Sequence, residues 1–391
     1  MTAKPYQGVA LVAPTSFGYT RQSERSANWF FGRTLARMLA DTGLSKADID
    51  GMAVTSITLQ PDSAITLTQH FGLTLRWLEQ IALGGASGIA AMQRGARAIQ
   101  AGDAEVIACI GADTSIKGGF VELISKFSRF TMDASYPYGA AGPNLPFSLI
   151  TRRYMDQYGA TREDFGRIAV SQRYNANHYE AALLGHKTLS LEEYLAARPV
   201  AGPLHLLDCV MPCAGAEGFL LMTEDRAQAL GRPYCTISAI GELHNAFPED
   251  PVQLRGGWAQ YCDRLYNNAG IGPQDIDLLE TYDDYPVISM LQMEGLGFCP
   301  AGKAPAFVAE TPLTFDGGGL PHNTSGGQLS IGQAGFAGGY LGLVEAARQL
   351  TGAATSNQVP DAVYGMVSGY GMINYDRGLC SAAAILRSAQ S

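Results

Sequence analysis

The sequence has little charge and no basic tract. Only 16% of its 391 residues are charged, and 36 acidic against 27 basic side chains leave a formal net charge of −9. Such a chain is a poor match for nucleic acid or an anionic membrane surface. It also lacks a run of about 18 apolar residues that could cross a bilayer, and its first residues do not have the layout of a signal peptide. We therefore expect a soluble, cytoplasmic protein.

Paired cysteine spacings are also missing. The seven cysteines are odd in number, scattered and without a C-x-x-C motif. This pattern predicts neither a disulfide framework nor a zinc knuckle, and we expect no metal site. The cysteines are interpreted as small buried hydrophobes.

Glycine and apolar residues are plentiful instead. The 46 glycines are dispersed among apolar segments, and hydrophobic residues make up 47% of the chain. Both features are typical of a folded globular protein of two or three domains.

A weak internal repeat suggests the architecture. Gly43-Leu-Ser-Lys-Ala-Asp-Ile-Asp-Gly-Met is echoed by Gly270-Ile-Gly-Pro-Gln-Asp-Ile-Asp-Leu-Leu. In each copy an amphipathic helical stretch precedes the repeat (28–44 and 258–271) and a strand-like segment follows it (52–55 and 278–282).

The two halves continue alike. Each has a glycine-rich turn, a helix (89–101 and 338–350) and an apolar strand (106–111 and 362–369), and each opens with one more strand (8–13 and 235–241). Alternating strands and helices predict two similar α/β halves, 1–230 and 231–391, with parallel sheets covered by helices. Residues from about 115 to 205 are richer in Arg, Tyr and His, and we expect a mostly helical insertion there, lying over the site.

Several motifs, in this order, resemble the thiolase superfamily, in particular its sterol-carrier and lipid-transfer branch. They are Gly84-Gly-Ala-Ser-Gly, Glu280-Thr-Tyr-Asp-Asp-Tyr, Glu294-Gly-Leu-Gly-Phe-Cys and Leu320-Pro-His-Asn-Thr-Ser-Gly-Gly. The resemblance covers nearly the whole chain. It implies αβαβα halves with a loop domain between them, a homodimer, and chemistry on the carbon–carbon bond next to a CoA thioester.

The residues that perform thiolysis in that family are absent. The nucleophilic cysteine corresponds to Gly85, the histidine of the Gly-His-Pro block to Gln333, and the second cysteine falls in the Val367-Ser-Gly-Tyr-Gly turn. The asparagine that holds a catalytic water corresponds to Tyr282. These losses exclude thiolase chemistry at position 85 and leave an acyl-CoA site possible.

What remains suits a different reaction. Free amides at the helix start, Gly84, Gly85, Ser87 and Gly88, with Gly371 of the second turn, could stabilise a thioester enolate. Glycine at position 85 would let the thioester approach, and Gln333 would add a neutral donor. The resemblance implies a retro-aldolase of steroid side chains in which a tyrosine, here Tyr282, acts as the base. Those enzymes have a second tyrosine where Gln333 stands, and Tyr370 is a candidate to replace it.

Other residues have plainer interpretations. Tyr285, expected to alternate with Tyr282 along a strand, is interpreted as a core tyrosine, and Asp283 and Asp284 as turn or dimer-contact residues. His322 is a candidate for either a structural or a catalytic role. Three arginines of the insertion could pair with CoA phosphates or simply be solvated: Arg152, Arg153 and Arg173.

Three functions remain open. The first is a CoA-thioester aldolase or retro-aldolase acting on a bulky acyl-CoA, with coenzyme A as part of the substrate and no bound cofactor. The second is a thiolase-type acyltransferase, and the third is a non-catalytic acyl-CoA carrier or scaffold subunit. The resemblance also implies a possible small partner subunit with an oligonucleotide-binding fold and a zinc ribbon.

Overall fold

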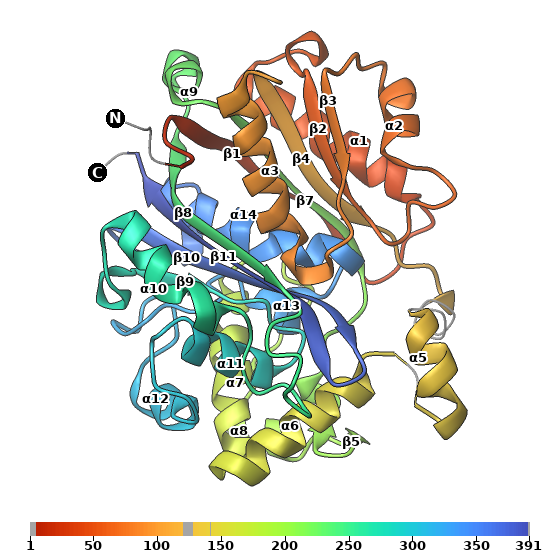
Figure 1. Cartoon of the computed structure of the whole chain (residues 1–391), viewed down its shortest axis with the longest axis vertical. Coiled ribbons are helices and arrows are strands. Elements are labelled where there is room, and N and C mark those ends of the chain that lie inside the picture. Colours follow the sequence, from red (N-terminus) through yellow and green to blue (C-terminus); the bar gives the residue numbers. More distant parts are fainter. Residues whose placement is uncertain (1–4, 120–127, 141, 390–391) are drawn as a thin grey trace.

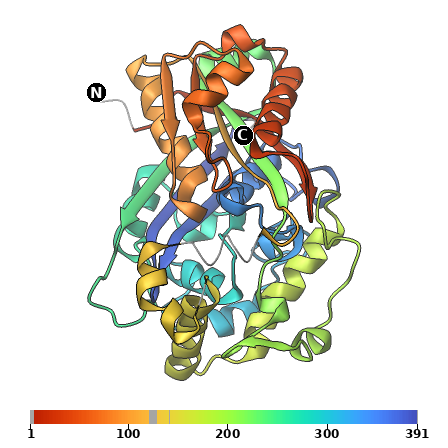
Figure 2. The same cartoon turned by 90° about the vertical axis from the view of Figure 1, so that its right-hand side faces the viewer.

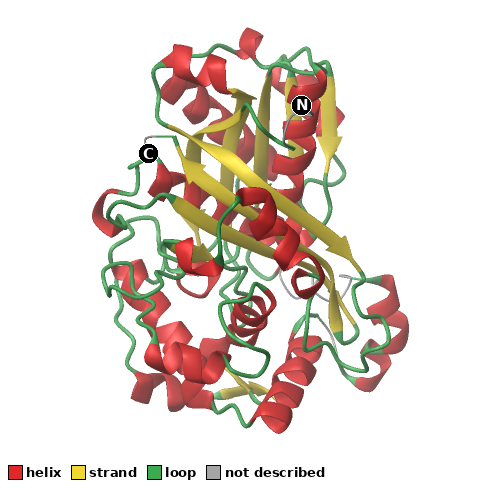
Figure 3. Ribbon diagram, turned by 60° about the vertical axis from the view of Figure 1, so that its left-hand side comes forward, coloured by secondary structure: helices red, strands yellow, loops and turns green. Residues whose placement is uncertain are grey.

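The computed structural model describes residues 5–119, 128–140 and 142–389. It contains a nine-stranded mixed sheet with helices on both faces (Figures 1 and 3). The strands of this sheet are β1 (Val9–Thr20), β2 (Gly51–Thr55), β3 (Trp77–Gln80), β4 (Val106–Asp113), β7 (Ala214–Thr223), β8 (Tyr234–His244), β9 (Leu278–Glu280), β10 (Tyr364–Asn374) and β11 (Arg377–Ser388).

The helices that flank the sheet follow the repeat. They are α1 (Ala27–Thr42), α2 (Ala64–Phe71), α3 (Ser87–Ala101) and α9 (Glu224–Leu230) in the first part of the chain. In the second part they are α10 (Trp258–Ala269), α11 (Pro286–Gly295), α12 (Ala304–Glu310), α13 (Gly327–Ile331) and α14 (Gly338–Leu350). The helices predicted from periodicity are therefore confirmed, with ends shifted by no more than two residues.

The strand order is β3-β2-β4-β7-β1-β8-β11-β10-β9. The series β2-β4-β7-β1 and β9-β10-β11-β8 have the same pairing, parallel for the first pair and antiparallel for the next two. The prediction of parallel sheets is thus wrong for five of the eight pairs in this sheet, because the strands that close each half return as antiparallel neighbours. The two series join where β1 pairs with β8.

Burial alternates along the strands and defines five layers. In β1, Leu11 faces a central core with α3 and α14, whereas Ala10 and Val12 face the outer helix α1. In β10, Val367 faces the same central core and Met366 faces α10. Because side chains alternate between the faces of a strand, the central helices are enclosed by strands of both halves.

The predicted insertion is confirmed as mostly helical. It contains α5 (Arg129–Ala134), α6 (Asn144–Tyr158), α7 (Arg162–Asn177) and α8 (Leu191–Leu195), and a short hairpin of β5 (Pro199–Ala201) and β6 (Leu204–His205). These elements gather at one end of the molecule in both views (Figures 1 and 2). The division of the chain at residue 230 stays a prediction, although the first strand series comes from residues 9–223 and the second from 234–388.

Candidate active site

The glycine-rich turn before α3 is closed off by a tyrosine ring. A Cβ atom built on Gly85 would lie 2.3 Å from Tyr282 Cε2 and 2.3 Å from the carbonyl oxygen of Tyr370. Only glycine fits here, because the phenol ring takes the space of a side chain. The ring of Tyr282 occupies the space of a side chain at position 85, and the approach of a thioester to the amides stays a prediction.

Tyr282 lies in the loop between β9 and α11, not on the strand where the sequence predicts it. Its backbone N–H donates to the carbonyl of Ser368 at 3.1 Å and to Gln292 Oε1 at 3.1 Å, and Gln292 Nε2 donates back to the Tyr282 carbonyl at 2.6 Å. Gln292 itself is buried on α11. These bonds fix the loop against two rigid elements, so the ring is held over Gly85.

The Tyr282 hydroxyl belongs to a three-residue cluster. Gln333 Nε2 donates to Tyr282 Oη at 3.0 Å and to Asp284 Oδ1 at 2.7 Å. Gln333 is the most exposed member of the cluster, and its role as a donor to the thioester oxygen stays a prediction. Asp284 was not predicted as a member of this cluster. The sequence feature that could have indicated it is its position two residues after Tyr282.

Burial controls the protonation of the cluster. It raises the pKa of Asp284 to about 8, with a smaller contribution from the charge of Asp283. The pKa of Tyr282 lies well above its usual value because the phenol is buried, and because the neighbouring Asp284 carboxylate repels a phenolate and accepts the phenol's hydrogen bond. Unionised Tyr282 is therefore the dominant form at neutral pH.

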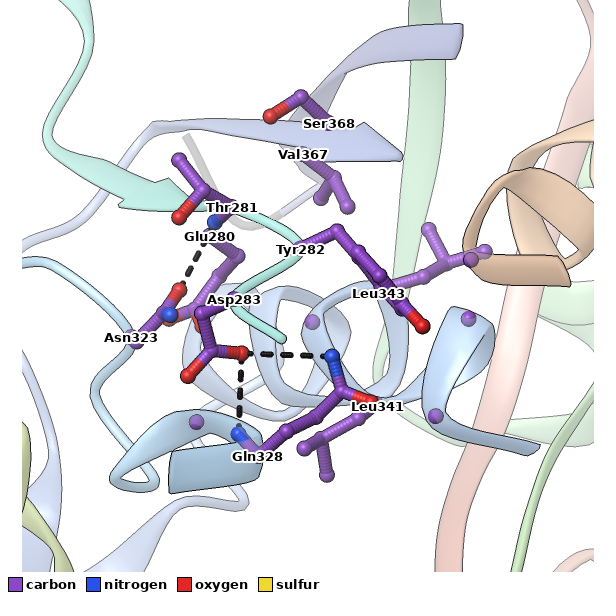
Figure 4. A pocket seen from close by; sticks show the side chains of 15 residues that line it. Glu280, Thr281, Tyr282, Asp283, Asn323, Gln328, Leu341, Leu343, Val367 and Ser368 are labelled. Carbon is purple, nitrogen blue, oxygen red and sulfur yellow. Dashed lines mark hydrogen bonds between the residues drawn. The ribbon is translucent and has the colours of Figure 1, made fainter. Parts of the chain in front are cut away.

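Asp283 has a structural role. Its carboxylate accepts the backbone N–H groups of Gln328 at 2.9 Å and Leu329 at 3.2 Å, at the start of α13. Figure 4 shows Asp283 turned toward Gln328 and Tyr282 turned away from it. The interpretation of Asp283 as a turn residue is confirmed, whereas that of Asp284 is wrong because its carboxylate faces the phenol.

His322 is a buried, neutral imidazole. Its Nε2 lies 2.8 Å from Thr281 Oγ1, and burial lowers its pKa to about 3. Thr281 Oγ1 also bonds to Ser289 at 2.9 Å. Of its two candidate roles, these contacts favour the structural one.

Tyr370 is directed elsewhere. Its hydroxyl donates to Gln253 Oε1 at 2.6 Å and accepts the Gly378 N–H at 2.5 Å, while its ring stacks on Trp258 at 5.8 Å between centroids. The idea that this phenol replaces a second catalytic tyrosine is therefore wrong, since its donor is already used within the core. Tyr285 is confirmed as a core tyrosine, bonded to Asn144 at 2.5 Å.

Three predicted thioester-binding residues have packing roles. A Cβ on Gly371 would lie 1.8 Å from the carbonyl oxygen of Leu83, and one on Gly88 would lie 2.4 Å from that of Gly339, where α3 crosses α14. Ser87 Oγ accepts the Leu83 N–H at 3.0 Å. These contacts explain why glycine is required at positions 88 and 371, and ligand binding by the backbone of these three residues stays a prediction. For Gly84 and Gly85 the oxyanion role stays a prediction.

The arginines of the insertion differ in environment. Arg173 is buried and donates to Ser330 at 2.9 Å. Arg152 is exposed, 3.8 Å from Asp156, and Arg153 lies one residue on along α6. Burial disfavours Arg173 as a CoA phosphate ligand, and for the other two that role stays a prediction.

Open space near the cluster is small. The cavity lined by Gly85, Tyr282 and Asp283 measures about 10 Å³, close to the least that holds one water. A groove of about 530 Å³ lies between α3, β8 and α10 and contains none of the cluster residues.

Two other features bear on the chemistry. Burial raises the pKa of all seven cysteines, which are free thiols. Among the described residues, only Glu242, His244 and Cys380 could offer three ligand atoms to a metal ion, and Arg94 already bonds Glu242 at 3.1 Å.

Within the described residues, no helix is long and apolar enough to traverse a membrane.

Comparisons with known proteins agree with this arrangement. A family model described as thiolase C-terminal domain-like matches residues 244–382. The 17-hydroxy-3-oxo-4-pregnene-20-carboxyl-CoA lyase of Mycobacterium tuberculosis is 31% identical over 368 residues, covering 88% of this chain and 91% of that protein. The steroid side-chain-cleaving aldolase of Thermomonospora curvata is 29% identical over 375 residues, covering 92% and 94%.

The solved structure of the Ltp2-ChsH2(DUF35) aldolase matches with a TM-score of 0.85 and 26% identity, over the whole of both chains. The chain belongs to the thiolase superfamily, in its sterol-carrier and lipid-transfer branch.

Proposed function

We propose that the protein is a CoA-thioester retro-aldolase, a lyase acting on a β-hydroxyacyl-CoA whose acyl group is bulky and steroid-like. The observation that carries this is the Tyr282 ring over Gly85, where a phenol stands in place of a nucleophilic thiol. The relatives named as a steroid aldolase and a pregnene carboxyl-CoA lyase support the reaction class and the substrate class.

In this reaction Tyr282 accepts the proton of the substrate's β-hydroxyl group while the phenol's own proton passes to a neighbouring group. The bond between the α and β carbons then breaks, the β carbon becomes a carbonyl, and the electron pair passes into the thioester enolate. Gln333, which donates to Tyr282 Oη at 3.0 Å, orients the phenol. Protonation of the enolate yields the shortened acyl-CoA, so coenzyme A belongs to the substrate and no bound cofactor is required.

Thiolytic acyl transfer is disfavoured by the same contacts. A thiol nucleophile needs a lowered pKa, and burial raises the pKa of every cysteine here, including Cys213, whose N–H bonds to the Gln333 carbonyl. A carrier without catalysis is the remaining alternative, and the experiment below separates it.

We further propose that the enzyme works as a homodimer with a small partner subunit of oligonucleotide-binding fold and zinc ribbon. The name of the solved aldolase sets ChsH2(DUF35) beside Ltp2, which supports a partner. Seven free thiols support a reducing, cytoplasmic location.

The test is turnover of a panel of β-hydroxyacyl-CoA thioesters, followed by mass spectrometry, with and without a co-expressed partner. Wild type should release a ketone or aldehyde and a shorter acyl-CoA. Tyr282→Phe should lose about 10²–10⁴-fold in turnover, the usual contribution of general acid–base catalysis. Tyr285→Phe is the matched control, because it removes a neighbouring buried hydroxyl that bonds Asn144. Binding without turnover of any member would favour the carrier.

A further inference from the structure

A phenol in this environment needs a second group to receive its proton. Tyr282 is buried and faces an acidic side chain, and the side chain that donates to its hydroxyl is the neutral amide of Gln333. No described cation bonds the phenol to stabilise a phenolate. Transfer of the substrate proton to Tyr282 is therefore favourable only if the phenol's own proton moves on in the same step.

Asp284 is placed to receive it. Gln333 Nε2 donates to both oxygens, at 3.0 Å from Tyr282 Oη and 2.7 Å from Asp284 Oδ1, so this shared donor brings the carboxylate of Asp284 beside the phenol. Asp283, the other nearby carboxylate, is occupied by the amides at the start of α13. Gln333 cannot take this role because a carboxamide does not titrate near neutral pH.

The surroundings tune Asp284 for a reversible exchange. Within the part of the chain that the structure describes, the titratable groups that face it are Tyr282, Asp283, Tyr285 and Tyr370, none of which is a cation. Burial is the main cause that brings the pKa of Asp284 to about 8, with the negative charge of Asp283 adding to it. A group with a pKa near the working pH can both accept and return a proton.

We propose that Asp284 is the proton acceptor behind Tyr282 in the retro-aldol reaction, and this inference rests on the function proposed above. The β-hydroxyl proton moves to Tyr282 Oη while the phenol proton moves to an Asp284 carboxylate oxygen. The bond between the α and β carbons breaks and its electron pair forms the thioester enolate. Asp284 then returns a proton through Tyr282 to the α carbon, so the cycle ends with an ionised carboxylate and a neutral phenol.

Asp284 is thus a positioning and proton-relay residue that acts through Tyr282. Together with Gln333 it fills the place for which a second tyrosine was expected from the sequence. The relay also explains why a buried carboxylate is tolerated beside the phenol, although burying an acid is costly without a compensating role.

The test compares wild type, Asp284→Asn, Asp284→Glu and Tyr282→Phe in the same turnover assay across pH. Wild-type kcat should rise with pH through an apparent pKa near 8, because the ionised carboxylate is the acceptor. Asp284→Asn should lower kcat by about 10²–10⁴-fold and remove this limb, while the Kd of an acyl-CoA lacking the β-hydroxyl stays unchanged. Asp284→Glu should recover part of kcat and keep the limb.

Asp263→Asn is the control, since Asp263 is an exposed carboxylate on α10 outside the cluster. Wild-type turnover, or an unchanged pH limb, in Asp284→Asn would overturn the relay. If Tyr282→Phe is inactive in that case, the retro-aldolase stands and only the relay fails; an inactive wild type overturns both.

A measurement on the wild type covers the case in which Asp284→Asn does not fold. In mixtures of H₂O and D₂O, a relay moves two protons in one step, so the rate should depend on the deuterium fraction with curvature. A linear dependence would contradict the relay.

Discussion

Gly85→Ala tests the steric relation at the centre of the site. The added methyl carbon would lie 2.3 Å from Tyr282 Cε2 and 2.3 Å from the Tyr370 carbonyl oxygen. Carbon atoms normally pack at about 3.5–4.0 Å, so the ring must retreat by more than about 1 Å. Its backbone is held by Ser368 and Gln292, and its hydroxyl by Gln333.

Two magnitudes follow from this geometry. Overpacking of a close-packed core costs about 1–3 kcal/mol, and the contact with the Tyr370 carbonyl, a backbone atom, argues for the upper part of this range. A displacement of about 1 Å at a reacting group can cost about 10²-fold in rate. We therefore expect Gly85→Ala to lower both the free energy of unfolding and kcat, whereas acyl-CoA binding changes less.

Urea unfolding monitored by fluorescence and the turnover assay measure the two effects. Gly365→Ala is the matched control, because it is also a buried glycine, and a Cβ there would lie 3.4 Å from Leu278 and Leu350 in ordinary contact. That variant should be as stable as wild type. If Gly85→Ala matches Gly365→Ala in both stability and kcat, the ring of Tyr282 does not occupy the position described above.

Two further predictions concern residues outside the cluster. Tyr370→Phe should lower the free energy of unfolding by about 0.5–1.5 kcal/mol, because Gln253 Oε1 and the Gly378 N–H each lose one hydrogen bond and keep the one between them at 3.0 Å. It should leave the pH profile of kcat unchanged, and loss of a pH limb would restore Tyr370 to the mechanism. His322 has a pKa of about 3 in the fold against about 6.5 unfolded, so the unfolded chain binds one more proton between these values. Stability should therefore fall as pH drops below about 6.5, by up to about 1.4 kcal/mol per pH unit from this residue. Comparison of urea midpoints for wild type and His322→Gln at pH 5 and 7 measures this effect, and equal pH dependence in the two proteins would refute it.

The sequence was sufficient for the features that local pattern controls. The helices α1, α3, α10 and α14 were predicted because each has a continuous apolar face and a clear end, such as Gly43 after α1 and Gly102 after α3. The insertion was predicted from its composition and length, and the approximate repeat from the matching segments that begin at Gly43 and Gly270. The direction of the strands was not predicted. A strand that pairs antiparallel to its neighbour, as β7 does with β4, has the same local sequence pattern as a parallel strand.

Site geometry depends on contacts between distant segments, and there the sequence was less informative. The resemblance indicated Gln333 and Tyr282 as separate candidates and not the hydrogen bond between them, and no local signal separates Asp283 from Asp284. Asp283 meets α13 and Asp284 meets Gln333 only because β9 ends at Glu280 and the loop turns toward α11. Tyr370 was misassigned for a similar reason, since its partner Gln253 is 117 positions away.

The absence of a thiol at position 85 and the presence of a phenol at position 282 have the same steric cause. A side chain at position 85 and the ring of Tyr282 compete for the same volume. The electrostatics point the same way. A thiolate at position 85 would lie near the phenol and the neighbouring Asp284 carboxylate, and a nearby carboxylate raises the pKa of a thiol. Gln333, a neutral amide, could not activate that thiol as a histidine does. A cysteine placed at position 85 would therefore displace the phenol without gaining a nucleophile, which supports our proposal that the loop after β9, and not the start of α3, carries the reacting group.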